Sequence, residues 1–356
     1  MLKILFTLLL PFTLFATNLS NSTNYNKELK TLNAFDIQPT FLYDPIMNEM
    51  RNKNSTYAND QRFFEAMDSA NSFIPTLKST LSQYQIPQEF LYLAMAESNF
   101  HIRANSSKSA AGLWQFMPQT GKNLNLKINA YVDERKDLIK STKAAAEYLS
   151  SLYDRFGKWY LVALAYNCGE GCVSRAIEKA GSDSLSVLLN PDKKYIPKES
   201  RFFIRKIVAF ALIGTDEQFH ISEDYEYLLN RANADTIATV KLPSGESLSR
   251  VAKILDMPLE DLKKLNRHLK YDFIPPYTEE YDVYIPYAKL SEFKQKYFKE
   301  PIQNIYKVHI VSKGESLFNI SAKYGVSYKV IKDFNNLRTN HLTLNQKLII
   351  PISKIV

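Results

Sequence analysis

Cysteine is scarce in this sequence, whose 356 residues include only Cys168 and Cys172, in "AYNCGEGCVSRA". Two thiols with no histidine nearby do not make a zinc site, and no metal-binding or nucleotide-binding motif occurs elsewhere, so we expect no cofactor. Outside the cytoplasm a disulfide is chemically permitted, but only where the backbone brings the two Cα atoms close together. The sequence leaves a disulfide and two free thiols equally open.

The apolar run near the start of the chain, residues 4–15, falls short of the roughly 20 residues that a membrane span needs. A lysine precedes this run and Ala16 follows it before a polar stretch, which is the pattern of a secretory signal peptide cleaved after Ala16. A retained N-terminal anchor is the alternative. Because no cysteine lies near this site, we expect no lipid anchor. We predict that residues 1–16 are a signal peptide and that the mature protein is periplasmic.

Acidic residues are outnumbered, 37 against 45 lysines and arginines, which gives a net charge of +8. This charge suits polyanionic partners such as nucleic acid, anionic lipid or cell-wall polymers, and export argues against nucleic acid. The sequence does not say whether membranes or other wall enzymes associate with the chain. With 45% hydrophobic and 23% charged residues the composition is globular, and the length allows two or three domains.

Hydrophobic periodicity divides the chain into segments. Residues 17–60 are rich in Asn, Ser, Thr and Lys, which predicts a poorly structured N-terminal segment. Residues 61–228 show helical spacing and few period-two runs, which predicts an all-α domain. Within it, "TKAAAEYLSSLYDRF" places its apolar residues on one helical face, with Thr142 as the predicted N-cap.

An internal repeat occupies the remainder of the chain. "GESL" occurs at 245–248 and again at 314–317, and at the same offset of 69 residues Asn266 matches Asn335. Each copy runs through a strand, two short helices and a strand, which predicts two βααβ modules at 235–288 and 304–352. The first copy has Asp256 where the second has Gly325, and it also carries an insertion with two prolines. We therefore expect the first copy to be degenerate.

The second copy resembles the LysM domain. The segments that carry the likeness are "YKVHIVSKGESLFNISAKYGVS", "IKDFNNL" and "LTLNQKLIIP". The resemblance implies binding of glycans that contain N-acetylglucosamine, such as peptidoglycan and chitin. A structural or partner-binding appendage is the alternative.

Glu97 continues an apolar helical stripe. In "EFLYLAMAESNF", Phe90, Leu93, Ala94 and Glu97 fall at i, i+3, i+4 and i+7 of a helix. A helix-end acid pointing to water is the ordinary interpretation. An apolar wall, however, raises the pKa of a carboxyl, as a general acid for glycoside cleavage requires. Hydrolytic glycosidases usually pair two carboxylates, and the next acid downstream is Asp133.

The surrounding motifs resemble the lysozyme-like domain of lytic murein transglycosylases of the membrane-bound D type. They are "ESNFHIRANSSKSAAGLWQFMPQTG", "DERKD", "STKAAAEYL" and "FGKWYLVALAYN", within residues 74–214, and the two repeats follow in the family's order. The resemblance implies a mechanism with one carboxyl. Glu97 protonates the oxygen between N-acetylmuramic acid and N-acetylglucosamine and then deprotonates the muramyl 6-hydroxyl. That hydroxyl closes on C1 and leaves a 1,6-anhydro end.

The resemblance also implies substrate contacts near Glu97. Ser98 completes the Glu-Ser pair and is expected to make local hydrogen bonds. Ser106 is expected to contact the muramyl acetamido region, and Gln115 and Met117 to line sugar subsites. For Met117, as for Trp114, a place in the core is the alternative.

Further along the chain, the resemblance implies that the Tyr166 hydroxyl reaches the catalytic carboxyl. Asn167 would fix the loop or contact sugar. Cys168 and Cys172 replace the family's usual small and polar residues, and we hypothesise that a disulfide between them stiffens this loop. Phe203 stands where the family commonly has tyrosine.

These observations predict an α+β protein, with an all-α lysozyme-like catalytic domain followed by two small LysM-type modules. The expected function is cleavage of peptidoglycan glycan strands by a lytic transglycosylase with a wall-binding module. A muramidase hydrolase on the same scaffold and a catalytically silent peptidoglycan-binding scaffold are the alternatives. A chitin-cleaving enzyme fits the motifs less well.

Overall fold

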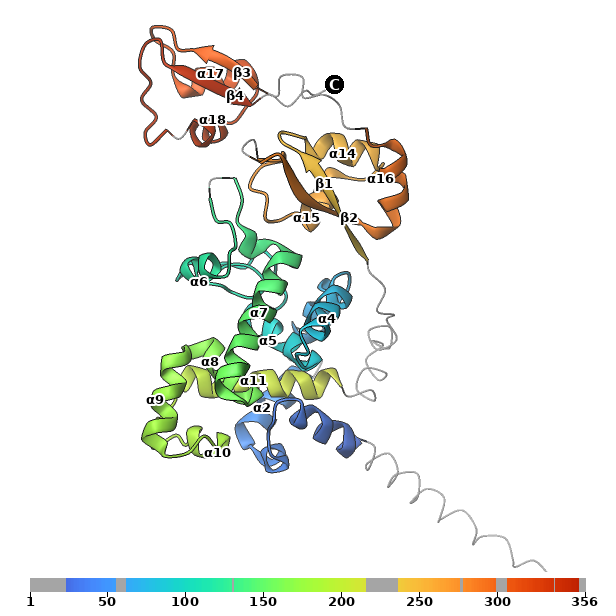
Figure 1. The fold of residues 1–356 in the computed structure, drawn as a ribbon, viewed down its shortest axis with the longest axis vertical. Coiled ribbons are helices and arrows are strands. Elements are labelled where there is room, and N and C mark those ends of the chain that lie inside the picture. Colours follow the sequence, from blue (N-terminus) through green and yellow to red (C-terminus); the bar gives the residue numbers. More distant parts are fainter. Residues whose placement is uncertain are drawn as a thin grey trace, which may run out of the picture. The chain divides into compact units, whose positions relative to one another are not determined.

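A computed structural model describes residues 24–55, 62–129, 131–215, 236–275, 278–298, 306–335 and 337–351. The predicted signal peptide, residues 1–16, lies outside this set. The chain divides into two compact units (Figure 1). The first comprises Met1–Ala104, Leu113–Gln115 and Thr142–Ala234, and the second comprises Asn105–Gly112, Phe116–Ser141 and Asp235–Val356.

The described part of the first unit is helical, as the periodicity predicts. Its central helix is α11 (Lys198–Gly214), which packs against α2, α5 and α8 and buries most of its length. The other helices are α2 (Pro45–Ser55), α3 (Arg62–Ser69), α4 (Ile74–Gln83), α5 (Leu91–Ser98), most of α7 (Leu138–Phe156), α8 (Trp159–Cys168), α9 (Glu170–Ala180) and α10 (Leu185–Leu188), with short 3-10 helices at Pro39–Tyr43 and Gln88–Phe90.

The prediction of a poorly structured segment over residues 17–60 is wrong for residues 24–55, which contain two helices and a 3-10 turn. The few apolar residues of this polar segment supply the reason, because Leu32, Phe35 and Met47 are fully buried. The Asp44 carboxylate also pairs with the guanidinium of Arg205 on α11 at 2.9 Å. Composition missed the segment because its core contacts come from helices far along the chain.

The N-cap of α7 is also different from the prediction. The helix begins at Leu138, and the Asp137 carboxylate accepts hydrogen bonds from the amides of Ile139 and Lys140 at 3.0 and 2.8 Å. Thr142 therefore lies inside the helix, where its hydroxyl accepts a hydrogen bond from the Trp114 indole.

The second unit contains α6 (Pro118–Asn123), a 3-10 turn at Glu134–Lys136 and two βααβ modules. The first module runs through β1 (Ile237–Pro243), α14 (Leu248–Ile254), α15 (Leu259–Leu265) and β2 (Glu280–Pro286), and α16 (Leu290–Lys296) follows it. The second runs through β3 (Tyr306–Ile310), α17 (Leu317–Tyr324), α18 (Tyr328–Phe334) and β4 (Lys347–Pro351). Each module has an antiparallel two-stranded sheet, so the predicted α+β class is confirmed.

The repeated asparagine has the same structural role in both modules. The Asn266 amide donates to the carbonyl four residues earlier and to the Tyr284 carbonyl, and its oxygen accepts from the Tyr284 amide. Asn335 makes the same three bonds with its own helix and with Ile349. This side chain therefore joins the second helix of each module to the last strand.

The turn between the two helices explains one difference between the copies. Gly325 has φ 65°, the left-handed conformation that glycine adopts at little cost. Asp256 adopts the same conformation in the first copy with φ 44°, although it carries a Cβ. The first copy thus keeps the turn without the residue that favours it.

Replacing Asn335 with alanine should loosen the second module, because the amide and carbonyl of Ile349 lose their partners. Both bonds to Ile349 are exposed, so water replaces part of each one, and we expect a loss of about 1–2 kcal/mol. Hydrogen exchange of peptides from 306–351 in the full chain would measure it. Asn340→Ala is the control, because Asn340 makes one exposed bond, to Lys332. Equal protection in both variants would contradict the prediction.

Candidate active site

Glu97 lies in the last turn of α5 and is partly buried. The predicted stripe beneath it is present, since Phe90, Leu93 and Ala94 are fully buried. The helix ends directly after Ser98, because Asn99 takes a left-handed conformation with φ 48°. The carboxyl therefore stands at the end of an apolar helix, with little of it in contact with water.

Burial raises the pKa of Glu97 to about 7. The positive charge of Lys206 opposes this shift, and the negative charge of Glu199 adds to it. Near neutral pH the carboxyl therefore holds its proton for a large part of the time and can also release it. A group with this property can act as general acid and then as general base.

Lys206 and Glu199 are functional candidates that the sequence did not reveal. Both lie on α11, and the Lys206 ammonium donates a hydrogen bond to the Ala96 carbonyl at 2.9 Å. That bond fixes the ammonium beside the end of α5. About a hundred residues separate the two helices in the chain, so neither spacing nor periodicity could bring these residues together.

Ser98 attaches the end of α5 to the loop that follows. Its hydroxyl donates to the Leu113 carbonyl at 2.8 Å, which matches the expected structural hydrogen bonding. In this loop Trp114 is fully buried, so it belongs to the core, which was the alternative for that residue. Its indole donates to the Thr142 hydroxyl at 3.0 Å.

Gln115 follows Trp114 with a left-handed backbone, φ 48°. Such a conformation is uncommon for a residue with a Cβ and often marks a functional position. The side chain is partly exposed, and its amide donates to the Ala104 carbonyl at 3.3 Å. The loop therefore holds Gln115 in a strained turn with its amide group near the surface.

Tyr166 lies close enough to Glu97 for the two charges to interact. Burial, then the charge of Glu97, then Tyr148 raise the pKa of Tyr166 well above its usual value, so the phenol is neutral. Its hydroxyl donates a hydrogen bond to the Trp114 carbonyl at 2.6 Å. That this hydroxyl reaches the catalytic carboxyl, as the resemblance implied, stays a prediction.

Asn167 and the two cysteines follow Tyr166 at the end of α8. The Asn167 amide oxygen accepts a hydrogen bond from the Ser200 hydroxyl at 2.5 Å, which connects α8 to α11. Cys168 and Cys172 are joined as a disulfide, with Cα atoms 5.8 Å apart, across Gly169 between α8 and α9. The bond closes the turn directly after Tyr166 and Asn167.

Ser106 and Met117 belong to the second unit. The Ser106 side chain is exposed, and its hydroxyl accepts a hydrogen bond from the Ala110 amide at 3.0 Å within a tight turn. Met117 is 43% exposed, which argues against the core position considered for it. Both side chains are therefore accessible on a loop.

Arg135 binds the backbone of this loop. One guanidinium nitrogen donates hydrogen bonds to the carbonyls of Ser109 and Phe116, at 2.7 and 3.0 Å, and the guanidinium forms an ion pair with the Asp133 carboxylate. The Arg135 carbonyl lies where a Cβ on Gly112 would stand, at 1.8 Å. Only glycine fits there, which explains the Gly-Leu-Trp motif.

No group of three potential metal ligands occurs among the described residues. In the same residues, no helix is both long and apolar enough to cross a membrane. A cavity of about 1130 Å³ opens elsewhere on the first unit, and none of its lining residues is a predicted site residue.

Comparison with known proteins identifies three domains. A model of the transglycosylase SLT domain matches residues 76–188, the LysM-like domain of lytic transglycosylase MltD matches 236–301, and the LysM domain matches 309–351. The membrane-bound lytic murein transglycosylase D of Escherichia coli is 26% identical over 323 residues, which cover 86% of this chain and 69% of the relative. The predicted resemblance is confirmed.

Two more distant matches cover smaller parts of the chain. The peptidoglycan transglycosylase gp16 of Escherichia phage T7 is 31% identical over 121 residues, which are 33% of this chain and 9% of the relative. The solved structure of the 70 kDa soluble lytic transglycosylase of Escherichia coli shares 21% identity and covers 43% of this chain and 25% of its own. Its TM-score of 0.32 is too low to support any argument.

Glu97→Gln should stabilise the protein at alkaline pH. Because the pKa of Glu97 rises from 4.5 to about 7 in the folded state, its ionisation destabilises that state as pH increases between these values. Glutamine removes the effect, so the variant should gain about 2–3 kcal/mol at pH 8 and nothing at pH 4. Thermal unfolding at both pH values measures it, with Glu178→Gln, a substitution of an exposed glutamate on α9, as control. A gain independent of pH would contradict the expected burial effect.

Proposed function

We propose that this homologue of the lytic murein transglycosylases cleaves the bond between N-acetylmuramic acid and N-acetylglucosamine without water. The product would be a 1,6-anhydromuramyl end. The observation that carries the proposal is Glu97, a carboxyl with its pKa raised to about 7 on a buried apolar wall inside a matched SLT domain. One such group can serve both proton transfers.

In the first step, protonated Glu97 donates its proton to the glycosidic oxygen, and the bond between that oxygen and muramyl C1 breaks. N-acetylglucosamine then leaves with a free 4-hydroxyl. In the second step the Glu97 carboxylate removes the proton of the muramyl 6-hydroxyl, whose oxygen bonds to C1. The proton returns to Glu97, and the high effective concentration of the intramolecular hydroxyl favours it over water.

Residues around Glu97 support each protonation state. The Lys206 ammonium stabilises the carboxylate that exists between the two steps, while the apolar wall favours the acid before and after them. Tyr166 stays neutral and fixes the backbone of the loop that carries Gln115. We assign Ser98 and Asn167 to support of this region, and Ser106, Gln115 and Met117 to sugar contacts.

A muramidase hydrolase is the alternative, and it requires a second carboxylate to assist water. Asp133 is a poor candidate because Arg135 occupies both of its carboxylate oxygens. Glu199 is the carboxylate whose charge acts on Glu97. The hydrolase hypothesis therefore reduces to a testable role for Glu199.

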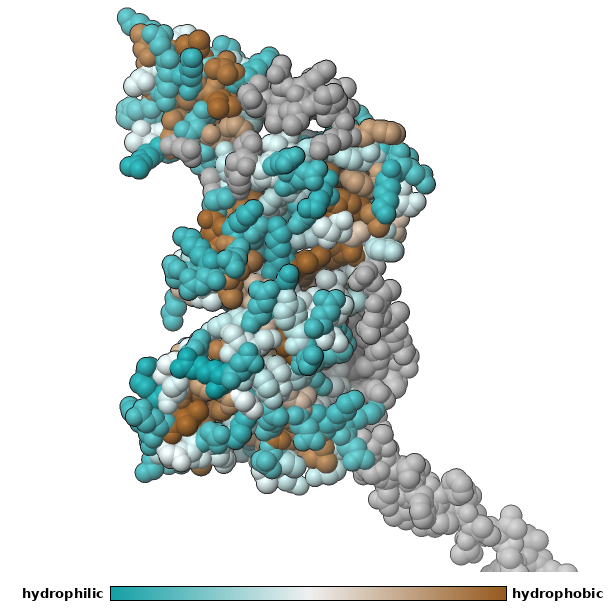
Figure 2. All heavy atoms as spheres, in the orientation of Figure 1, coloured by the Kyte–Doolittle hydropathy of each residue, from teal (hydrophilic) through white to brown (hydrophobic). Residues whose placement is uncertain are grey.

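The second module is the proposed wall-binding element. Apolar side chains reach its surface (Figure 2), with Phe318, Leu344 and Val308 at 68%, 61% and 58% exposure. Exposed apolar groups can pack against the apolar C–H faces of sugar rings. The module also has more lysines than acidic residues, which suits an anionic polymer. We further propose that residues 1–16 direct export to the periplasm.

Muropeptide analysis of purified sacculi tests this function. Wild type should release anhydromuramyl products, and Glu97→Gln should lose at least about 1000-fold in rate, because the proton donor is gone. Mass spectrometry of the soluble fraction distinguishes the two chemistries. Reducing ends from wild type, lost in Glu199→Gln, would establish the hydrolase. Intact sacculus binding without any product would favour the silent scaffold.

The pH dependence of kcat/KM should report the pKa of Glu97. Activity should fall above about pH 7 as the acid loses its proton. Lys206→Met removes the opposing charge and should move this limb to higher pH, whereas Glu199→Gln removes the repulsion and should move it to lower pH. Initial rates on soluble glycan oligomers between pH 5 and 9 measure the shifts. If the alkaline limb moved in the same direction in Lys206→Met and in Glu199→Gln, the assignment would be contradicted.

A further inference from the structure

The first module joins the segment 127–140 through its backbone and its core. Val132 pairs with Leu269 in an antiparallel β-bridge, and the Asp133 amide donates to the His268 carbonyl at 2.9 Å. Val132 is fully buried and belongs to the hydrophobic core of the module itself. A residue of the SLT sequence thus completes the core of the LysM-like module.

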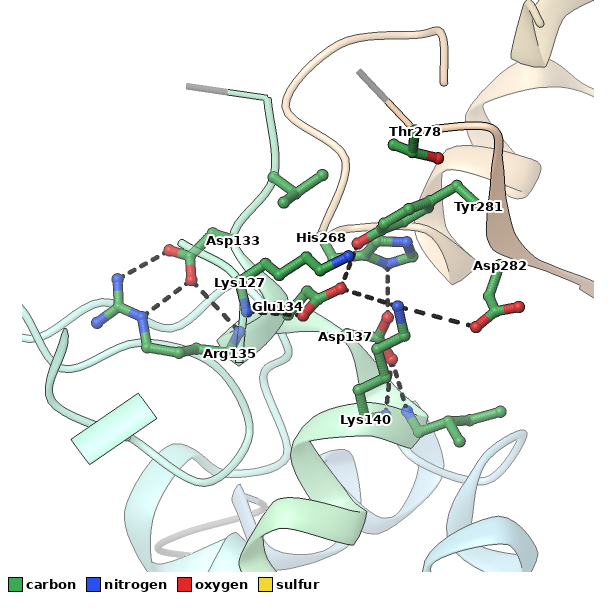
Figure 3. A network of polar contacts seen from close by, with 12 residues as sticks. Lys127, Asp133, Glu134, Arg135, Asp137, Lys140, His268, Thr278, Tyr281 and Asp282 are labelled. Atoms are coloured by element: carbon green, nitrogen blue, oxygen red, sulfur yellow. Dashed lines mark hydrogen bonds and ion pairs between the residues drawn. The ribbon is translucent and has the colours of Figure 1, made fainter. Parts of the chain in front are cut away.

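Two buried tyrosines of β2, Tyr281 and Tyr284, strengthen this junction, and Figure 3 shows Tyr281 beside Glu134. The Tyr281 hydroxyl donates to the Glu134 carboxylate at 2.6 Å, and the Tyr284 hydroxyl donates to the Asp137 carboxylate at the same distance. Glu134 is 2% exposed and Asp137 is fully buried. Hydrogen bonds to buried carboxylates are strong, so losing one is costly even where other partners remain.

The Glu134 carboxylate has two further contacts that define its position. Its carboxylate accepts a hydrogen bond from the Lys127 amide at 2.7 Å and pairs with the Lys140 ammonium at 2.8 Å. Burial alone would raise the pKa of Glu134, but the bonds from Lys140, Tyr281 and the Lys127 amide hold it below its usual value. Glu134 is therefore an ionised structural anchor, and Tyr281 is its contact from the module.

Arg135 links the position of Glu134 to the position of the substrate loop. It is the next residue in the 3-10 turn, and its guanidinium holds the carbonyls of Ser109 and Phe116. Ser106 lies three residues before Ser109, and Met117 directly follows Phe116, so both flank the stretch of loop that Arg135 holds. A displacement of the turn would therefore move both proposed sugar contacts.

The second module lacks the tyrosines of this junction. Asn266 bonds to Tyr284 as Asn335 bonds to Ile349, which aligns β2 with β4. By this alignment Gln346 stands in the place of Tyr281. Tyr281 and Tyr284 are thus specific to the first copy, and this is one way in which that copy differs from the second.

We propose that the first LysM-like module positions the substrate loop of the catalytic domain, with Tyr281 as the positioning residue that holds Glu134. The inference rests on the proposed function for the roles of Ser106 and Met117. The module uses this face within its own chain, and wall binding then depends on the second module.

Tyr281→Phe in the full chain tests the proposal, with Tyr297→Phe as the matched control. Tyr297 also donates to a glutamate, Glu246, at 2.8 Å, but that bond lies inside the module. Tyr281→Phe should speed hydrogen exchange of peptides 104–118 and 127–140 by about tenfold or more and raise KM for soluble glycan oligomers at least threefold, with kcat and sacculus binding unchanged. Tyr297→Phe should change none of these.

Two results would overturn the proposal. One is equal exchange in the loop peptides of both variants. The other is a fall in kcat that follows the folded fraction while KM stays constant, since that is the effect of a merely structural tyrosine. If wild type has no activity, the proposed function fails, and the exchange comparison still decides whether the module holds the loop.

A second substitution serves if Tyr281→Phe does not fold. Glu134→Gln weakens the bond from the Tyr281 hydroxyl and also the ion pair with Lys140, so exchange and KM should change in the same direction. If both variants fold, their effects in a double-mutant cycle should be non-additive, because both substitutions act on the bond between Tyr281 and Glu134. Additive effects would overturn the assignment of Tyr281 to Glu134.

Discussion

A carboxyl taken out of water must either keep its proton or gain partners for its charge, and the rest of this structure depends on that constraint. Glu97 has an apolar wall and one nearby ammonium, so its pKa rises to about 7. Glu134 is more deeply buried but receives bonds from a tyrosine, a lysine and an amide, so its pKa falls. One side-chain type thus supplies the proposed proton donor in one place and a fixed anion in another.

The side chains that make the pKa of Glu97 differ from that of Glu134 come from distant parts of the chain. Lys206 reaches the end of α5 from α11, and Tyr281 reaches Glu134 across 147 residues of sequence. The contact between Tyr281 and Glu134 leads through Arg135 to the loop with the proposed sugar contacts. Under the proposed roles of Ser106 and Met117, the first LysM-like module supports the substrate loop in addition to forming part of the C-terminal region.

The sequence predicted what depends on local pattern. The stripe beneath Glu97 follows from helical spacing, and the two modules follow from a repeat that includes Asn266 and Asn335. It missed what depends on contacts between remote segments. Residues 24–55 looked unstructured because few of them are apolar, yet those few are buried by other helices. Nothing in the local sequence distinguishes Lys206 or Tyr281 from an ordinary surface residue.

The second unit is discontinuous, because residues 116–141 share it with the chain after residue 235. A polypeptide is synthesised from its N-terminus, so the Glu134 segment is made long before Tyr281 can bind it. The hydrophobic core around Val132 can close only when β2 has arrived. The order of synthesis therefore imposes an order of assembly, in which the loop around Ser106 acquires its final support after almost four fifths of the chain has been made.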